Sequence, residues 1–163
     1  MGVVHNLMSI QKLPVSLDDA WSFFSNAQNL LSITPAFLNL KVTNEIFEDE
    51  VYAGQMIAYN VKPLADIAVS WVTEITHLQP KKMFVDEQRK GPFKLWHHQH
   101  HFKAIKGGTQ MTDLIHYRLP FGILGTAVHP IVKKKLFAIF TYRFEKINEL
   151  FGSWPGQLAN IKI

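Results

Sequence analysis

Hydrophobic and polar residues alternate with a period of two through the middle of the chain, between Leu38 and Leu119. This alternation is typical of strands that bury one face, because successive side chains of a strand point to opposite sides. Turn-forming residues divide the region into predicted strands over residues 39–47, 55–62, 66–77, 82–89, 94–106 and 109–119. Because short turns join consecutive strands, we expect an antiparallel meander.

The N-terminal part of the chain predicts one strand and two short helices. Residues 4–13 carry the alternation of a first strand. Ser16 has the side chain of a helix N-cap, and the two aspartates that follow it favour the positive end of the helix dipole. A helix is therefore expected from Ser16 to about Ser25. A second short helix is expected over residues 28–33, since a proline disfavours helical backbone angles at the residue before it.

A helical period returns after Leu119. Apolar residues recur at intervals of three and four up to Gly152, a residue suited to end a helix. Pro130 fits this helix only in its first turn or at a break just before it. The order of elements predicts an α+β fold, in which a curved antiparallel sheet of about seven strands wraps around the long C-terminal helix. A gap between such a sheet and one helix suits a small apolar ligand.

The composition limits the function classes. With 163 residues, 47% of them hydrophobic and 18% charged, the chain can bury the core of one globular domain, which we expect to cover residues 1–163. The absence of cysteine excludes disulfides, thiolate metal sites and cysteine nucleophiles. The sequence also lacks a glycine-rich phosphate loop, a Gly-x-Ser-x-Gly elbow and a His-Glu-x-x-His helix, so the enzyme classes with these motifs are excluded.

Charge and hydropathy argue against nucleic acid and membrane insertion. The net charge is +4, and the longest basic run, Lys133–Lys135, is too short for a nucleic-acid-binding tail, so no nucleic acid is expected. The N-terminus lacks the pattern of a signal peptide, and no apolar run approaches the ~20 residues that span a bilayer. We therefore expect a cytoplasmic protein without membrane insertion.

Residues 91–102 contain four of the eight histidines of the chain. Strand alternation puts Trp96, His98, His100 and Phe102 on one face, so that two aromatic rings enclose two imidazoles. The opposite face of the same strand is more polar. This contrast indicates that the face with the aromatic rings and imidazoles points inward.

Carboxylates are expected beside these imidazoles. A two-residue turn at Gly107-Gly108 would put Phe102 opposite Asp113 and His98 opposite Tyr117. If the preceding hairpin keeps the same parity, Asp86 and Gln88 join this face, with Asp86 beside His98. Buried carboxylates and imidazoles are costly unless they pair, so we expect the cluster to be hydrogen-bonded or to face water in a cavity.

Three interpretations of His98 and His100 are open. The imidazoles can belong to a hydrogen-bonded network that lines a pocket, each held by a carboxylate or a tyrosine. Histidines two apart on a strand lie ~6.5–7 Å apart on one face, and with Asp86 or Asp113 they can chelate a divalent ion. An imidazole beside a carboxylate also suits general acid–base catalysis. We adopt the network as our prediction, with no metal and no other cofactor.

Three further residues are candidates for the pocket. Tyr59 and Trp71 are large aromatic residues with a polar edge, which suits a cavity wall. Arg143 interrupts the apolar face of the last helix, and either reaches solvent or points into the cavity as an anion anchor. The complete set of candidate ligand-binding residues is Tyr59, Trp71, Asp86, Gln88, Trp96, His98, His100, Phe102, Asp113, Tyr117 and Arg143.

Four segments carry a resemblance to a known family. They are Phe84-Val85-Asp86-Glu87-Gln88 followed by Gly91-Pro92-Phe93, Trp96-x-His98-x-His100-x-Phe102, Gly107-Gly108-Thr109-x-Met111-Thr112-Asp113, and Tyr117-x-Leu119-Pro120-Phe121-Gly122. With these segments and its order of elements, the chain resembles the START-like superfamily, also called SRPBCC or the birch-pollen-allergen fold. Within it, the chain is similar to a bacterial branch of ligand-binding SRPBCC proteins sometimes labelled cell division inhibitor. No residue of the chain supports a role in division.

The resemblance implies a helix-grip fold, with a cavity for a hydrophobic or amphipathic small molecule between the sheet and the C-terminal helix. Members of the superfamily include lipid carriers, plant hormone receptors and polyketide aromatase/cyclases, and the fold does not choose among them. Our first hypothesis is therefore ligand binding. A cyclase, dehydratase or hydrolase, with His98 or His100 as a general base activated by Asp86 or Asp113, is the alternative. A protein-interaction or regulatory module that uses exposed loops and Lys133–Lys135 is the second alternative, and a homodimer stays open.

Overall fold

Eight antiparallel strands form one sheet in the computed structural model, which describes residues 2–45, 49–62, 67–120 and 123–163. The strand order across the sheet is β2-β3-β4-β5-β6-β7-β1-β8, so the chain runs as a meander from β2 to β7. The first strand lies next to β7, and β8 forms the edge beside it. The strands are β1 (His5–Leu13), β2 (Lys41–Val42), β3 (Met56–Val61), β4 (Val69–Gln79), β5 (Met83–Lys90), β6 (Leu95–Ile105), β7 (Gly108–Arg118) and β8 (Asn160–Lys162).

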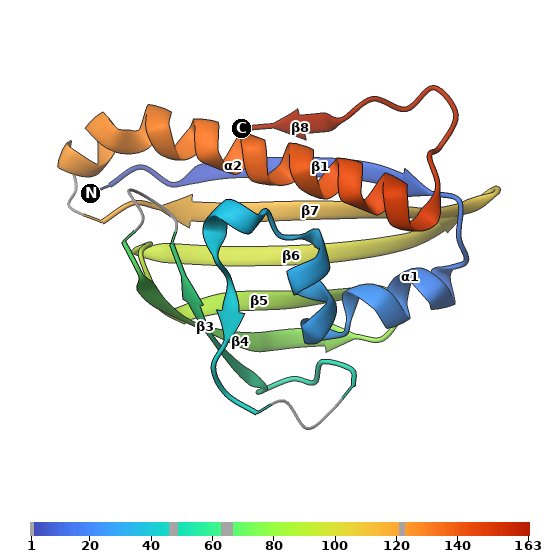
Figure 1. Ribbon diagram of the computed structural model, residues 1–163, viewed down its shortest axis with the longest axis horizontal. Coiled ribbons are helices and arrows are strands. Elements are labelled where there is room, and N and C mark those ends of the chain that lie inside the picture. Colours follow the sequence, from blue (N-terminus) through green and yellow to red (C-terminus); the bar gives the residue numbers. More distant parts are fainter. Residues whose placement is uncertain (1, 46–48, 63–66, 121–122) are drawn as a thin grey trace.

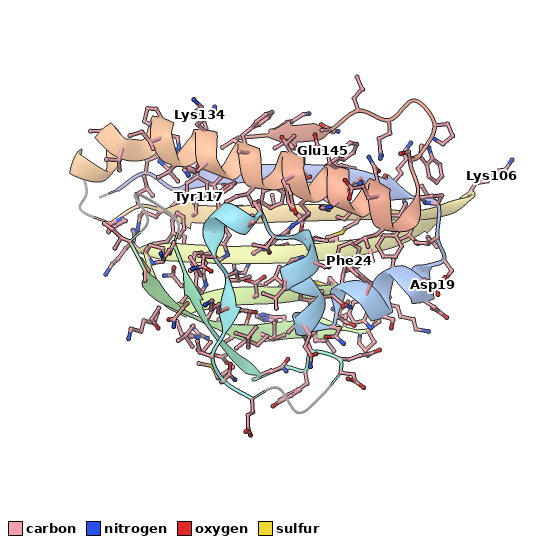
Figure 2. All side chains as sticks on the ribbon, in the orientation of Figure 1. Asp19, Phe24, Lys106, Tyr117, Lys134 and Glu145 are labelled. Carbon is pink, nitrogen blue, oxygen red and sulfur yellow. The ribbon has the colours of Figure 1, made fainter. Side chains whose placement is uncertain are left out.

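Helices cover one face of this sheet (Figure 1). They are α1 (Leu17–Phe24), the 3-10 helices η1 (Ala27–Ile33) and η2 (Ala36–Leu38), and the long α2 (Ile123–Phe151). The Ser16 side chain caps α1 by accepting a hydrogen bond of 3.1 Å from the backbone N–H of Asp19, as predicted. In Figure 2, Lys134 and Glu145 lie on the exposed side of α2, and Lys106 lies at the tip of the β6–β7 hairpin.

The inward faces of the strands form two apolar clusters with these helices. In the first, Trp21 of α1 packs edge-on against Phe84 and Phe102 of the sheet, with ring centroids 6.0 and 5.5 Å apart. In the second, α2 buries Leu136 and other apolar residues against β1 and β7. The predicted helix-grip architecture is therefore confirmed: a curved sheet grips a long C-terminal helix.

The structure differs from the predicted elements at both ends. The sheet has eight strands rather than about seven, because β8 pairs with β1 through Met8 and Lys162. A strand of three residues at the end of a chain is too short to show a period. β2 has only two residues where residues 39–47 were expected, and the second short helix is of the 3-10 type. Residues 46–47 and 66 of the predicted strands, and Phe121-Gly122, lie outside the described residues.

The predicted register of the β6–β7 hairpin is wrong by two residues. Ile105 pairs with Gly108, so the turn consists of Lys106 and Gly107. Gly107 has the positive φ (+87°) that the turn requires, whereas a Cβ on Gly108 would lie 2.0 Å from the backbone oxygen of Leu13. Glycine is thus needed at both positions, but for different reasons. Because the shift is even, every side chain keeps its predicted face.

The helix α2 begins earlier than predicted, so Pro130 lies inside it rather than in its first turn. An interior proline removes one helical hydrogen bond and costs roughly 3 kcal/mol. Burial of Val132, Leu136 and Phe140 against the sheet favours the helix on the C-terminal side of the proline. No helix among the described residues is long and apolar enough to span a membrane.

Candidate functional site

A cavity of about 590 Å³ lies between the sheet and the helices. Its lining comes from α1, η1, strands β3 to β7 and α2, and it is mostly apolar. Three aromatic residues pack at one part of the wall: Trp71 meets Trp96 and Phe93 edge-on, with ring centroids 5.2 and 5.7 Å apart. Such rigid aromatic surfaces favour apolar ligands.

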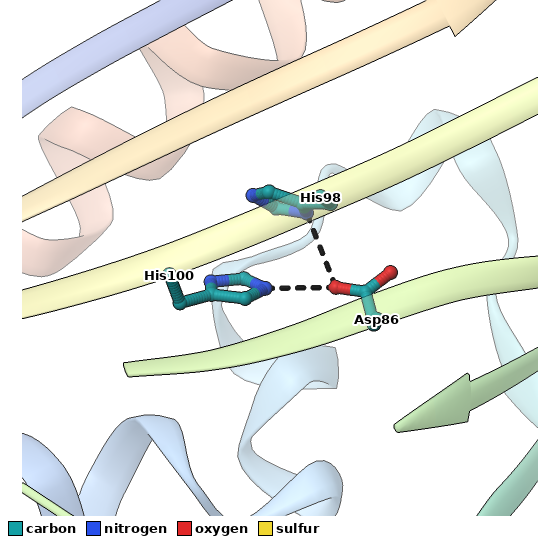
Figure 3. Close-up of side chains that lie close together, drawn as sticks. All are labelled: Asp86, His98 and His100. Carbon is teal, nitrogen blue, oxygen red and sulfur yellow. Dashed lines mark hydrogen bonds and ion pairs between the residues drawn. The ribbon is translucent and has the colours of Figure 1, made fainter. Parts of the chain in front are cut away.

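Four side chains from three neighbouring strands form a closed polar ring at the wall. His98 and His100 project from β6, Asp86 from β5 and Asp113 from β7. His98 Nε2 lies 2.9 Å from Asp113 Oδ1 and His98 Nδ1 lies 3.3 Å from Asp86 Oδ2. His100 Nε2 lies 2.8 Å from Asp86 Oδ2 and His100 Nδ1 lies 3.0 Å from Asp113 Oδ1. Each imidazole therefore lies between both carboxylates (Figure 3 shows the Asp86 side).

The carboxylates and imidazoles of this ring stabilise one another's charged forms. Burial by itself would lower the pKa of His98, but the charge of Asp86 and the hydrogen bonds to Asp113 and Asp86 outweigh it and raise this pKa to about 9. Burial would raise the pKa of Asp86, yet the His98 charge and the hydrogen bond from His100 hold it well below its usual range. Hydrogen bonds from His100 and His98 overcome burial in the same way and lower the pKa of Asp113. At neutral pH the ring therefore holds two carboxylates and at least one imidazolium.

Arg143 of α2 points into the cavity, which decides between its two predicted orientations. Its side chain is only 11% exposed, and Nη1 lies 4.0 Å from Asp113 Oδ1. The guanidinium lies over the ring of Phe140, 4.9 Å from its centroid. Its buried Nε has no hydrogen-bond partner among the described residues. A guanidinium has only donors, so Arg143 offers N–H groups to an acceptor in the cavity.

The comparison with protein families decides where the chain belongs. The model of the family "Polyketide cyclase / dehydrase and lipid transport" matches residues 13–139. The chain belongs to this family. The polyketide cyclase/dehydrase family is part of the START-like, or SRPBCC, superfamily that the four sequence segments resemble.

Solved structures share the fold of this family at low sequence identity. The Zhui aromatase/cyclase from Streptomyces sp. R1128 is 10% identical with a TM-score of 0.70, over 91% of this chain and 93% of that one. Ginseng major latex-like protein 151 from Panax ginseng is 15% identical with a TM-score of 0.65, over 92% and 99%. Protein Ms6760 from Mycobacterium smegmatis is 14% identical with a TM-score of 0.63, over 89% of both chains. No curated protein sequence matches the chain.

Seven of the eleven candidate residues of this polyketide cyclase/dehydrase family member line the cavity, and four do not. The seven are Tyr59, Trp71, Asp86, Trp96, His98, His100 and Arg143. Burial and the negative charge of Asp86 raise the pKa of Tyr59, so its hydroxyl stays protonated. Tyr59 lies opposite Trp71 in the β3–β4 pair, where the indole Nε1 donates to Thr73 Oγ1 over 3.1 Å.

The other four candidates, Gln88, Phe102, Asp113 and Tyr117, are absent from the lining. Gln88 donates to the backbone oxygen of Phe93 (2.7 Å) and accepts from its N–H (3.2 Å), so it fixes the β5–β6 connection. Phe102 is buried in the core against Phe84 and α1. Asp113 contacts the imidazoles through the ring nitrogens that Asp86 does not contact. It therefore positions the two histidines rather than facing the cavity.

Tyr117 does not hydrogen-bond to His98 or His100, contrary to one option of the predicted network. Its hydroxyl lies 3.0 Å from His129 Nε2 of α2, and the His129 ring stacks on His5 with centroids 3.6 Å apart. Burial, followed by the charges of His5 and Lys133, lowers the pKa of His129. The sequence contains no signal for these two contacts, because they join the end of β7 and the start of β1 to the first part of α2 across the tertiary structure.

Proposed function

We propose that this protein binds a hydrophobic or amphipathic small molecule in the cavity between the sheet and α2. One observation carries the proposal: an apolar cavity of about 590 Å³ whose charged lining residues, apart from Lys135, gather at one region of the wall. Cavities of ~300–1,000 Å³ accommodate organic ligands, with apolar walls for affinity and few polar groups for orientation. The family description, which includes lipid transport, supports the same class of ligand.

The polar end of the ligand is expected to meet Arg143. Its Nε is buried, and Nη1 lies 4.0 Å from the Asp113 carboxylate, which is too far for a hydrogen bond. A ligand carboxylate or carbonyl oxygen would satisfy these N–H groups, while its apolar part contacts Trp71, Trp96 and Phe93. The proposed ligand is thus an apolar molecule with an oxygen acceptor at one end.

A binding measurement with a fluorescent fatty-acid analogue tests the proposal. Ile139 and Arg143 line the cavity, so Ile139→Trp is expected to weaken binding at least tenfold by filling it, and Arg143→Met by removing the donors. Phe137→Trp is the matched control, because Phe137 is 51% exposed on the other side of the same helix. It should bind as the unaltered protein does. Equal affinity of Ile139→Trp and Phe137→Trp would place the probe outside the cavity.

Native mass spectrometry of the protein as purified complements this test. A retained organic mass that is lost in a His98→Ala/His100→Ala variant supports a ligand seated against the imidazoles, and its mass narrows the ligand class. Retention of the same mass at the same occupancy in the variant would show that the ligand does not depend on the imidazoles of the polar ring. A thermal melt of the variant distinguishes loss of the ligand from loss of the fold.

A second candidate function is an enzyme of the cyclase or dehydratase type. The observation that favours it is His98, a buried imidazole in the cavity wall with carboxylates at both nitrogens. Because its pKa is raised to about 9, His98 would donate a proton at neutral pH rather than accept one. The rate at which the retained molecule is converted is then expected to fall about 100-fold in His98→Gln. Liquid chromatography with mass spectrometry measures this rate. An unchanged rate would remove the enzyme hypothesis.

A further inference from the structure

Three potential ligand atoms converge at the polar ring. Asp86, His98 and His100 each offer one atom, and these atoms all lie within 4.8 Å of one another. Asp86 Oδ2 is 3.3 Å from His98 Nδ1 and 2.8 Å from His100 Nε2, as the dashed lines of Figure 3 mark. Ligand atoms that share an ion at ~2.1 Å are about 3.0–3.4 Å apart. Small movements of these side chains would therefore bring all three onto one ion.

We propose that Asp86, His98 and His100 bind one divalent transition-metal ion, such as Zn²⁺, in the wall of the cavity. Two imidazole nitrogens and one carboxylate oxygen suit zinc, ferrous iron or cobalt better than calcium or magnesium, which prefer oxygen ligands. The site goes beyond the proposed ligand binding and does not depend on it.

The position of Asp113 supports the metal site. It lies 2.9 Å from His98 Nε2 and 3.0 Å from His100 Nδ1, the nitrogens that Asp86 does not contact. A histidine that ligates a metal usually donates its other ring N–H to a carboxylate or carbonyl, which fixes its tautomer. Here a single carboxylate serves both histidines, and Asp113 is only 4% exposed.

The donors and acceptors of the ring balance when an ion is present. A carboxylate only accepts, and a neutral imidazole has one N–H, so without an ion both imidazoles need two protons each to satisfy all four contacts. Two imidazolium rings with centroids 3.8 Å apart repel each other. With an ion, each neutral imidazole gives a lone pair to the metal and its N–H to Asp113.

The charges balance as well. A divalent ion compensates the two carboxylates, of which Asp113 is buried and Asp86 is half-buried. The three ligands line the cavity whereas Asp113 does not. Three protein ligands leave at least one coordination position, and this position is available to water or to an oxygen of a cavity ligand.

Titration of tag-free, chelator-treated protein with Co²⁺ and then Zn²⁺ tests the proposal without any cavity ligand. We expect visible Co²⁺ absorption that saturates at one ion per chain and is displaced by Zn²⁺. His98→Ala, His100→Ala and Asp86→Asn should each weaken binding at least 100-fold. Asp113→Asn should keep the stoichiometry and weaken binding about 10- to 100-fold, as expected for a positioning residue.

His97→Ala is the matched control, because His97 lies on the same strand but pairs with Glu87 on the opposite face of the sheet. It should bind Co²⁺ as the unaltered protein does. Binding weaker than millimolar, or an equal loss in His97→Ala, would overturn the site. Histidine ring NMR signals of the unaltered protein provide a readout that needs no variant: Zn²⁺ must shift those of His98 and His100 and leave His97 in place. Because no ligand is present, failure here leaves the proposed ligand binding standing.

Discussion

Asp113→Ala is expected to lower the free energy of unfolding of the metal-free protein by about 3–5 kcal/mol. Asp113 is 4% exposed and faces one nitrogen of His98 and one of His100. Its removal leaves two buried imidazole nitrogens and the nearby Arg143 without their carboxylate, and a buried polar group without a partner keeps its full desolvation cost. Urea denaturation followed by circular dichroism measures the change.

Glu87→Ala is the matched control for this variant. Glu87 pairs with His97 over 2.7 Å between the same two strands that carry Asp86 and His98, but the side chains of Glu87 and His97 are both about 30% exposed. An exposed pair of this kind contributes only about 0–1 kcal/mol. The two losses in the free energy of unfolding must therefore differ by at least about 2 kcal/mol. Similar losses would show that burial does not determine how much Asp113 contributes to stability.

The second large effect concerns pH. The metal-free protein is expected to lose about 3 kcal/mol of stability as the pH rises from about 6.5 to above 9. The pKa of His98 is raised from 6.5 to about 9, so between these values the folded state binds a proton that the unfolded state releases. This contribution is fully present below pH 6.5 and is lost as the pH rises through about 9.

The groups that face His98 determine the sign of this effect. Asp86 and Asp113 are negative, and their charges and hydrogen bonds outweigh the effect of burial on the pKa of His98. Because the pKa of both carboxyl groups is lowered, their own contribution is present above their usual pKa and disappears only as the pH falls through the lowered values.

Urea denaturation at pH 6.5, 8 and 9.5 checks the alkaline loss, and chelator is present throughout so that no ion competes for the ring. In His98→Gln the titrating group is gone, and the free energy of unfolding should change much less over the same range. A flat profile for the unaltered protein, or an identical slope in His98→Gln, would contradict the assignment to His98.

The period of the sequence determined which side chains lie inside. Alternation along residues 94–106 put Trp96, His98 and His100 on the inner face, and the structure buries or half-buries all three. This prediction survived a register error of two residues, because a strand has a side-chain period of two and an even shift returns each residue to the same face. The helix-grip architecture followed in the same way from the order of the periods.

Tertiary structure decided which of these inward residues touch. The true register puts His100 opposite Asp113, and only this pairing closes the ring of two carboxylates and two imidazoles. The turn conformation set the register, through the positive φ of Gly107 and the close packing of Gly108 on Leu13, and neither is visible in the hydrophobic pattern.

The cavity and the position of Arg143 in its wall also depend on contacts between distant segments. Periodicity put Arg143 on the inner side of α2, but whether the side chain reached solvent depended on how the helix lies across the sheet. The same packing joins Tyr117 to His129 and removes Tyr117 from the polar ring. The sequence alone determined the inward face and its chemistry, because these follow from local periods. The closed ring, the cavity and the contact of Tyr117 with His129 could be found only in the tertiary structure, because each needs side chains from separate strands or helices that packing brings together.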